Sequence, residues 1–164
     1  EKDVERRRKF RREILDAILG STNVPAPEVL VESEIQAALR DYARYLANNG
    51  VDPKEADWDK LQADAREGAV RRVQEYLVLD EIARREGIQV SETELEAEFK
   101  RAAARRGVEP GKLREQMAKG DGLEARRDEM RLARTIDLLI SKAAVLPSEA
   151  GDGRRNTEDE ENAK

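Results

Sequence analysis

Two residue types are missing from the 164-residue chain, and their absence excludes much of protein chemistry. Without cysteine, neither disulfides nor thiolate chemistry is available, which fits a reducing compartment. Without histidine, the chain lacks the commonest general base, the commonest metal ligand and every Ser-His or Cys-His pair. We therefore expect no catalytic site, no metal site and no cofactor in this chain.

Aromatic residues and long apolar runs are also scarce. Aromatic residues make up 4% of the chain, and no stretch approaches the roughly 18 apolar residues that span a bilayer. The first residues are charged, without the pattern of a signal peptide. We expect a cytoplasmic protein with no membrane partner. Because the chain begins at Glu1 and not at Met, we also expect it to be a fragment of a longer protein.

Charged residues dominate what is present, at 41% of the chain against 38% hydrophobic residues. Such a mixture is typical of long helices with solvated outer faces and a thin core, and hence of an elongated shape. Residues 146–164 contribute −3 to the net charge of −5, which leaves −2 for the body. We expect a disordered acidic tail over residues 147–164, which have too few apolar groups to fold. The nearly neutral body argues against direct nucleic-acid binding.

Apolar residues recur at three- and four-residue spacing along most of the chain, which predicts helices. The run from Tyr76 to Leu79 is apolar on all sides, and we expect it to form the most buried turn. No segment alternates with a two-residue period, so we expect an all-α domain over residues 1–146 with no β-sheet. The predicted helices cover about residues 2–19, 27–48, 57–86, 92–106 and 123–145, with a loop at 51–56 and a short helix that starts at Glu109-Pro110.

Clusters of charge have ordinary explanations. Paired carboxylates on helices can hold two metals, but the known di-metal bundles also need Glu-x-x-His, which this chain cannot supply. The basic run between Arg6 and Arg12 could contact RNA or a membrane surface. Acidic residues interleave with that run, and no aromatic residues are placed to stack on bases. We interpret both features as solvated helix faces.

A few apolar residues are candidates for binding other polypeptides. Tyr42 and Tyr45, with Trp58, could contact a client, although lone aromatic residues near helix ends more often pack inside. Phe99, Leu113 and Met117 lie on two short helices joined by a tight turn. That unit is too small to enclose its own apolar surface, and methionine suits promiscuous surfaces. Core packing and client contact both remain open for these residues.

Two stretches resemble the C-terminal domain of bacterial trigger factor. One is Asn23-Val-Pro-Ala-Pro-Glu-Val-Leu-Val-Glu-Ser-Glu-Ile35, and the other runs from Leu79 through Gly-Ile-Gln-Val-Ser to Leu95. Their order and separation are similar to those of the family, and the resemblance covers roughly residues 5–146. The second stretch also resembles the helical domain of periplasmic parvulin-type folding factors.

The resemblance to trigger factor implies an ATP-independent, ribosome-associated chaperone whose protruding helical arms cradle unfolded or nascent polypeptides. In that family the ribosome-docking domain and the FKBP-like prolyl isomerase domain lie outside this segment, so we expect neither activity here. Leu46 and Leu113 fall at apolar cradle positions of the family, and Met117 falls at or next to another. Gly107 stands where an aromatic residue can occur. We thus predict client contacts at Tyr42, Leu46, Phe99, Leu113 and Met117.

Two other hypotheses remain open at this stage. One is a fragment of a periplasmic parvulin-type chaperone, and the other is a helical adaptor that binds one defined protein. An adaptor should bind one sequence, whereas a chaperone should bind many.

Overall fold

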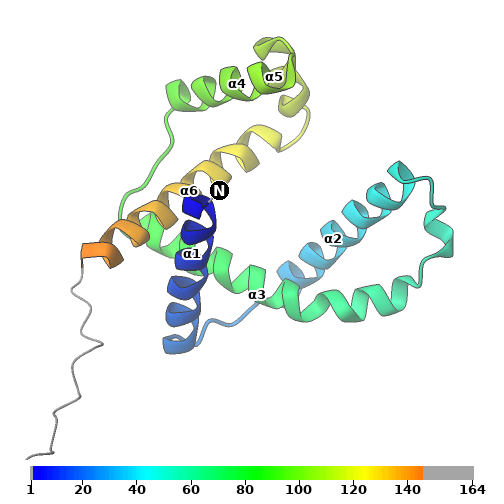
Figure 1. The fold of residues 1–164 in the computed structure, drawn as a ribbon, viewed down its shortest axis with the longest axis horizontal. Coiled ribbons are helices and arrows are strands. Elements are labelled where there is room, and N and C mark those ends of the chain that lie inside the picture. Colours follow the sequence, from blue (N-terminus) through cyan, green and yellow to red (C-terminus); the bar gives the residue numbers. More distant parts are fainter. Residues whose placement is uncertain (1, 146–164) are drawn as a thin grey trace, which may run out of the picture.

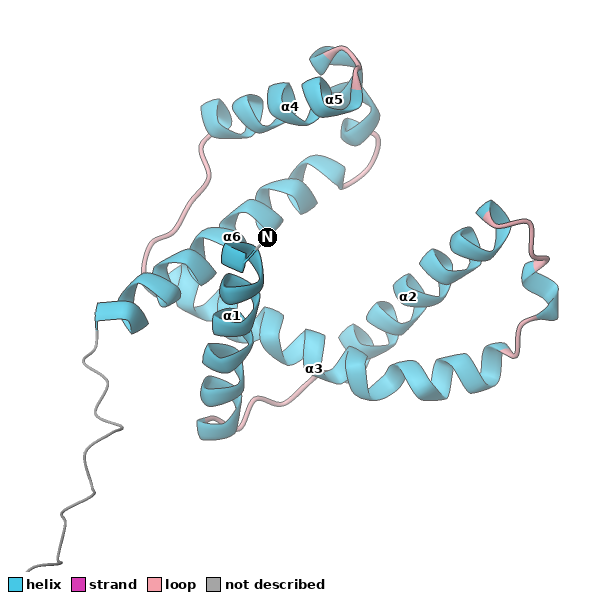
Figure 2. Ribbon diagram, viewed as in Figure 1, coloured by secondary structure: helices cyan, strands magenta, loops and turns pink. Residues whose placement is uncertain are grey.

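The computed structural model describes residues 2–145, which form six α-helices and one short 3-10 helix without any strand (Figures 1 and 2). This confirms the predicted all-α fold for that part of the chain. The predicted disordered tail over residues 147–164 lies outside the described residues. The elements in chain order are α1 (Lys2–Ser21), α2 (Glu28–Asn48), η1 (Pro53–Glu55), α3 (Trp58–Arg85), α4 (Glu92–Arg106), α5 (Pro110–Ala118) and α6 (Gly122–Val145).

The helices form two arms that project from a central body (Figure 1). The first arm consists of α2, η1 and the N-terminal half of α3, which run side by side. The second arm consists of α4, α5 and the N-terminal part of α6. In the body, α1 packs against the middle of α3, where Asp16 pairs with Arg71, and against the C-terminal half of α6, where Arg7 pairs with Asp137. Helices α3 and α6 therefore each belong to an arm and to the body.

The ends of α4 show why sequence signals place helix boundaries well. The Ser91 hydroxyl accepts a hydrogen bond from the Glu94 amide at 3.3 Å, and the Glu94 carboxylate accepts one from the Ser91 amide at 2.8 Å. This reciprocal pair satisfies two amides that have no partner inside the helix. At the other end, Gly107 adopts a left-handed conformation with φ of 64°, which costs glycine little.

The arms have separate apolar cores. In the first arm, a cluster forms where α2 packs against α3, and its buried members are Val31, Ile35, Ala69 and Val73. In the second arm, α4 and α5 enclose another cluster together with the segment before α4, and its buried members are Val90, Leu95, Phe99, Ala103 and Leu113. Neither cluster is thick, as the low aromatic content predicted.

Two sequence-based expectations need correction. The run from Tyr76 to Leu79 is not buried on all sides: Val78 and Leu79 are buried, but Tyr76 is exposed and its hydroxyl donates to Asp128 at 3.2 Å. The helix at this point packs on only part of its circumference. The predicted loop at 51–56 contains η1, which begins where the Asp52 carboxylate accepts a hydrogen bond from the Lys54 amide at 2.9 Å.

Separate cores predict that damage to one arm stays local. Phe99→Ala should cost about 3–5 kcal/mol of stability and Ile35→Ala about 2–5 kcal/mol, because each empties a fully buried site. In amide hydrogen exchange, Phe99→Ala should lower protection in α4 and α5 and leave the α2–α3 contact unchanged. Ile35→Ala is the matched control and should do the reverse. Equal loss of protection in both arms for either variant would contradict separate cores.

Candidate client-binding surfaces

The tip of the first arm carries a cluster of three aromatic side chains. The Tyr42 and Tyr45 rings stack with centroids 6.2 Å apart, and the Trp58 ring meets Tyr42 edge-on at 6.3 Å. The Trp58 indole N–H donates to the Pro53 carbonyl at 3.0 Å, which anchors α3 to the preceding turn. Tyr42 is 39% exposed and Tyr45 is 61% exposed. The cluster therefore exposes its two tyrosines to solvent, while its tryptophan is half-buried.

Leu46 lies one turn beyond Tyr42 on α2 and is buried. It occupies the inner face of the helix, while the Leu46 carbonyl accepts hydrogen bonds from the amides of Asn49 and Val51 at 3.0 Å each. These bonds close the end of α2. In this conformation Leu46 offers little surface of its own.

The second arm contains a groove of about 470 Å³ between α4, α5 and α6. Phe99, Leu113 and Met117 all line it, so the fold brings together three residues that the sequence singled out. Phe99 and Leu113 are 2% and 4% exposed and form its floor, whereas Met117 is only half-buried. The groove also has a charged rim, which consists of Glu98, Arg105, Arg106, Arg126 and Glu129.

Glu98 organises that rim. It accepts hydrogen bonds from Arg101 at 2.9 Å, from Arg105 at 3.2 Å and from Arg126 at 2.5 Å. Burial opposes the ionisation of Glu98, but the three arginines outweigh it, so the pKa of Glu98 is lowered. The carboxylate thus stays charged and fixes Arg126 of α6 against α4, which keeps the wall of the groove in place.

Further ion pairs join α6 to the rest of the molecule. Glu92 at the start of α4 binds Arg114 of α5 at 2.6 Å and Arg127 of α6 at 2.7 Å. Glu94 binds Arg134 of α6 at 2.6 Å. Arg131 pairs with Asp80 of α3. The second arm is therefore held by charge contacts across helices as well as by its apolar core.

Neither a metal site nor a membrane-spanning element emerges from residues 2–145. This part of the chain has no group of three or more acidic, histidine or cysteine side chains that could hold a metal ion. Within it, no helix combines the length and apolar character needed to cross a bilayer.

The five predicted contact residues thus fall into two groups. Tyr42 and Met117 present side-chain surface to solvent, while Leu46, Phe99 and Leu113 are buried. Tyr45 was considered beside Tyr42 from the sequence but is not among the five predicted contacts, although it is the most exposed aromatic residue of the arm tip. Its spacing of three residues from Tyr42 favours including it, because such residues share a helix face. No comparable spacing in the sequence indicates that the arginines of the groove rim lie beside the groove.

The fold and its surfaces define a class of protein: a two-armed, all-helical module with apolar patches set in a charged frame. The family model for the C-terminus of bacterial trigger factor protein matches residues 1–141. The chain belongs to the trigger factor family, and its matched part is the family's C-terminal region. This membership supports a chaperone family role.

Several relatives named trigger factor support the assignment. That of Opitutus terrae is 35% identical over 147 residues, which cover 88% of this chain and 33% of the relative. That of an Anaeromyxobacter species is 34% identical, with 89% of this chain and 36% of the relative covered. That of Koribacter versatilis is 34% identical, with 80% and 31% covered. The chain spans about a third of the length of these relatives. No solved structure matches it.

The Glu94–Arg134 pair predicts a specific acid sensitivity of the second arm. Hydrogen bonds from Arg134 and then from Ser91 lower the pKa of Glu94 from 4.5 to about 2. Above pH 4.5 the carboxylate is ionised in both the folded and the unfolded chain, so its stabilising contribution is complete. As the pH falls toward about 2, the unfolded chain takes up the proton first and the contribution is lost.

The measurement is thermal unfolding of the unmodified chain and of Glu94→Gln between neutral pH and pH 2. The unmodified chain should be the more stable at neutral pH, and the difference should shrink as the pH falls below 4.5. Arg134→Gln removes the main cause of the shift and should reduce the pH dependence in the same way. A difference that stays constant over the whole range would contradict this assignment.

Proposed function

We propose that this chain is an ATP-independent chaperone module that binds unfolded or nascent polypeptides at two surfaces. The first surface is the aromatic cluster at the tip of the first arm, and the second is the groove between α4, α5 and α6. The observation that carries the proposal is this pairing of exposed apolar groups on separate arms. Each surface is small, so a client gains affinity by occupying several weak sites at once.

The chemistry of the two surfaces suits clients without a fixed sequence. Tyrosines offer broad apolar faces with little loss of side-chain entropy, and methionine adapts its shape to the group it meets. Binding that needs no nucleotide must be weak enough for a client to leave as it folds. Scattered apolar patches within a mixed-charge surface meet this requirement and limit self-association.

Within this proposal, the predicted contact residues have two roles. Tyr42 and Met117 contact clients directly, together with Tyr45. Leu46, Phe99 and Leu113 hold these residues in place and form the floor against which a client side chain packs. Burial of part of one apolar side chain is worth about 1–2 kcal/mol, so each contact alone is weak.

The greater length of the relatives extends the proposal to activities outside this chain. Because the chain spans about a third of its relatives, we assign ribosome attachment and prolyl isomerase activity to other parts of the parent protein. We also propose a cytoplasmic location, which agrees with the absence of cysteine. Membership of the trigger factor family favours this proposal over a periplasmic parvulin-type chaperone.

The test combines one residue from each surface. The double variant Tyr42→Ser/Met117→Ser should suppress the aggregation of an unfolded client far less than the unmodified chain does. Each single variant should have a modest effect, because about 1–2 kcal/mol corresponds to a five- to thirtyfold change in one contact. Thermal unfolding should shift far less than for a change at a fully buried residue, because Tyr42 is exposed and Met117 is only partly buried at the edge of the second-arm core.

Val4→Ser is the matched control, because Val4 is an exposed apolar residue on α1, a helix that contributes to neither surface. It should retain full suppression. Two results would overturn the site assignment: unchanged suppression by the double variant, or a collapse of its stability. Several unrelated clients should be used, because a helical adaptor would protect one protein and not the others.

A further inference from the structure

Besides the groove in the second arm, the structure has a hollow in the body that the proposed function does not use. It lies between α1 and α3, with a volume of about 500 Å³. The buried side chain of Leu15 lies among its lining residues. Three arginines line it from α1, at positions 8, 11 and 12, and Arg71 lines it from α3. The spacing of three and four residues places the α1 arginines on one face of the helix.

The hollow carries an excess of positive charge. Its lining includes four arginines and two carboxylates, those of Asp16 and Glu75, although the whole chain has a net charge of −5. Arg71 binds both carboxylates: it pairs with Asp16 and donates to Glu75 at 2.9 Å. No carboxylate of the described residues lies within ion-pair distance of Arg8, Arg11 or Arg12.

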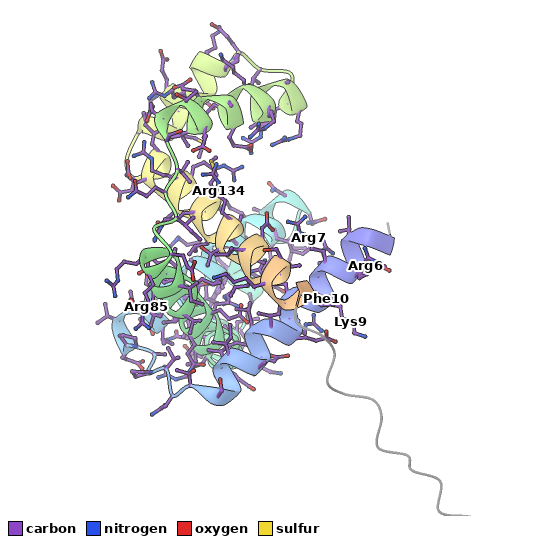
Figure 3. The ribbon with its side chains drawn as sticks, turned by 90° about the vertical axis from the view of Figure 1, so that its left-hand side faces the viewer. Arg6, Arg7, Lys9, Phe10, Arg85 and Arg134 are labelled. Atoms are coloured by element: carbon purple, nitrogen blue, oxygen red, sulfur yellow. The ribbon has the colours of Figure 1, made fainter. Side chains whose placement is uncertain are left out.

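Nearby basic residues differ from these three. Arg7 on the neighbouring face pairs with Asp137 of α6, and Lys9 has Glu13 within 3.8 Å. Figure 3 shows Arg6, Arg7 and Lys9 along the same helix, beside the exposed Phe10. The hollow is thus the part of α1 where guanidinium groups gather without acidic partners.

We propose that this hollow binds the acidic run Glu158-Asp-Glu-Glu161 of the same chain. Four consecutive carboxylates match three arginines that have no partner among residues 2–145, and carboxylates pair well with guanidinium groups. The run belongs to a segment whose net charge is −3, while the hollow has a net charge of +2. Charge complementarity and the covalent connection together favour this occupant over a free anion.

The chain between the end of α6 and the acidic run is long enough for the run to reach the hollow. Val145 follows Asp137 by eight residues, or about 12 Å of helix, and Arg11 follows Arg7 by four residues, or about 6 Å. Since Arg7 pairs with Asp137, the distance from the end of α6 to the hollow is at most about 18 Å plus the length of the side chains. The 13 residues from Val145 to Glu158 can span up to about 45 Å. The tether also raises the effective concentration of the acidic run at the hollow.

The experiment uses the full chain with a nitroxide on Asn162→Cys, which introduces the sole cysteine. At low salt, the label should broaden amide signals of α1 around residues 8–15 and of α3 around residues 71–75. The broadening should largely disappear near 1 M salt, where the Debye length falls to about 3 Å. It should also disappear in Arg8→Gln/Arg11→Gln/Arg12→Gln and when residues 158–161 are neutralised.

A matched triple variant, Arg40→Gln/Arg44→Gln/Arg85→Gln, removes three positive charges elsewhere and should retain the broadening. Labelled chain mixed with isotope-labelled chain lacking the nitroxide shows whether the contact is intramolecular. Broadening in that mixture would mean that a second copy occupies the hollow, and would overturn the proposal. No broadening of α1, or broadening that the first triple variant leaves unchanged, would overturn it as well.

Discussion

Helix α3 runs without interruption from Trp58 to Arg85, a length of about 42 Å, and the shape of the molecule depends on this continuity. Its N-terminal half and middle pack on α2, its middle also contacts α1, and its C-terminal part contacts α6 in the body. Helix α6 links the second arm to the same body, where Arg131 pairs with Asp80 of α3. The arms therefore share one base, although their buried apolar clusters are separate.

Most of the fold could be predicted from local signals. The capping box at Ser91, the extended Pro27 and the glycine at 107 fix helix ends through contacts within a few residues. Burial was harder to predict, because it depends on which helix arrives from elsewhere in the chain. The run from Tyr76 to Leu79 has apolar residues on every side, yet Tyr76 reaches solvent and its hydroxyl donates to Asp128 of α6.

Burial was also the part of the groove that the sequence could not predict. The sequence grouped Phe99, Leu113 and Met117 because they lie on short neighbouring helices, and all three line the groove. It could not tell the buried floor from the exposed edge, since α6 forms the remaining wall. The contact between Glu98 and Arg126 spans 28 residues, and no spacing rule reveals such a pair. The role of these residues in client binding stays a prediction.

The central claim is that both arms contact many unrelated clients, and site-specific photo-crosslinking tests it most directly. A photoreactive amino acid would replace Tyr45 at the arm tip or Met117 in the groove, and Arg40 on the outer face of α2 would serve as the control position. Several unrelated proteins would be offered in unfolded form. We expect crosslinks to each client from Tyr45 and Met117, few from Arg40, and none to the same proteins when folded. Crosslinks to a single protein, or none above the control, would contradict the claim.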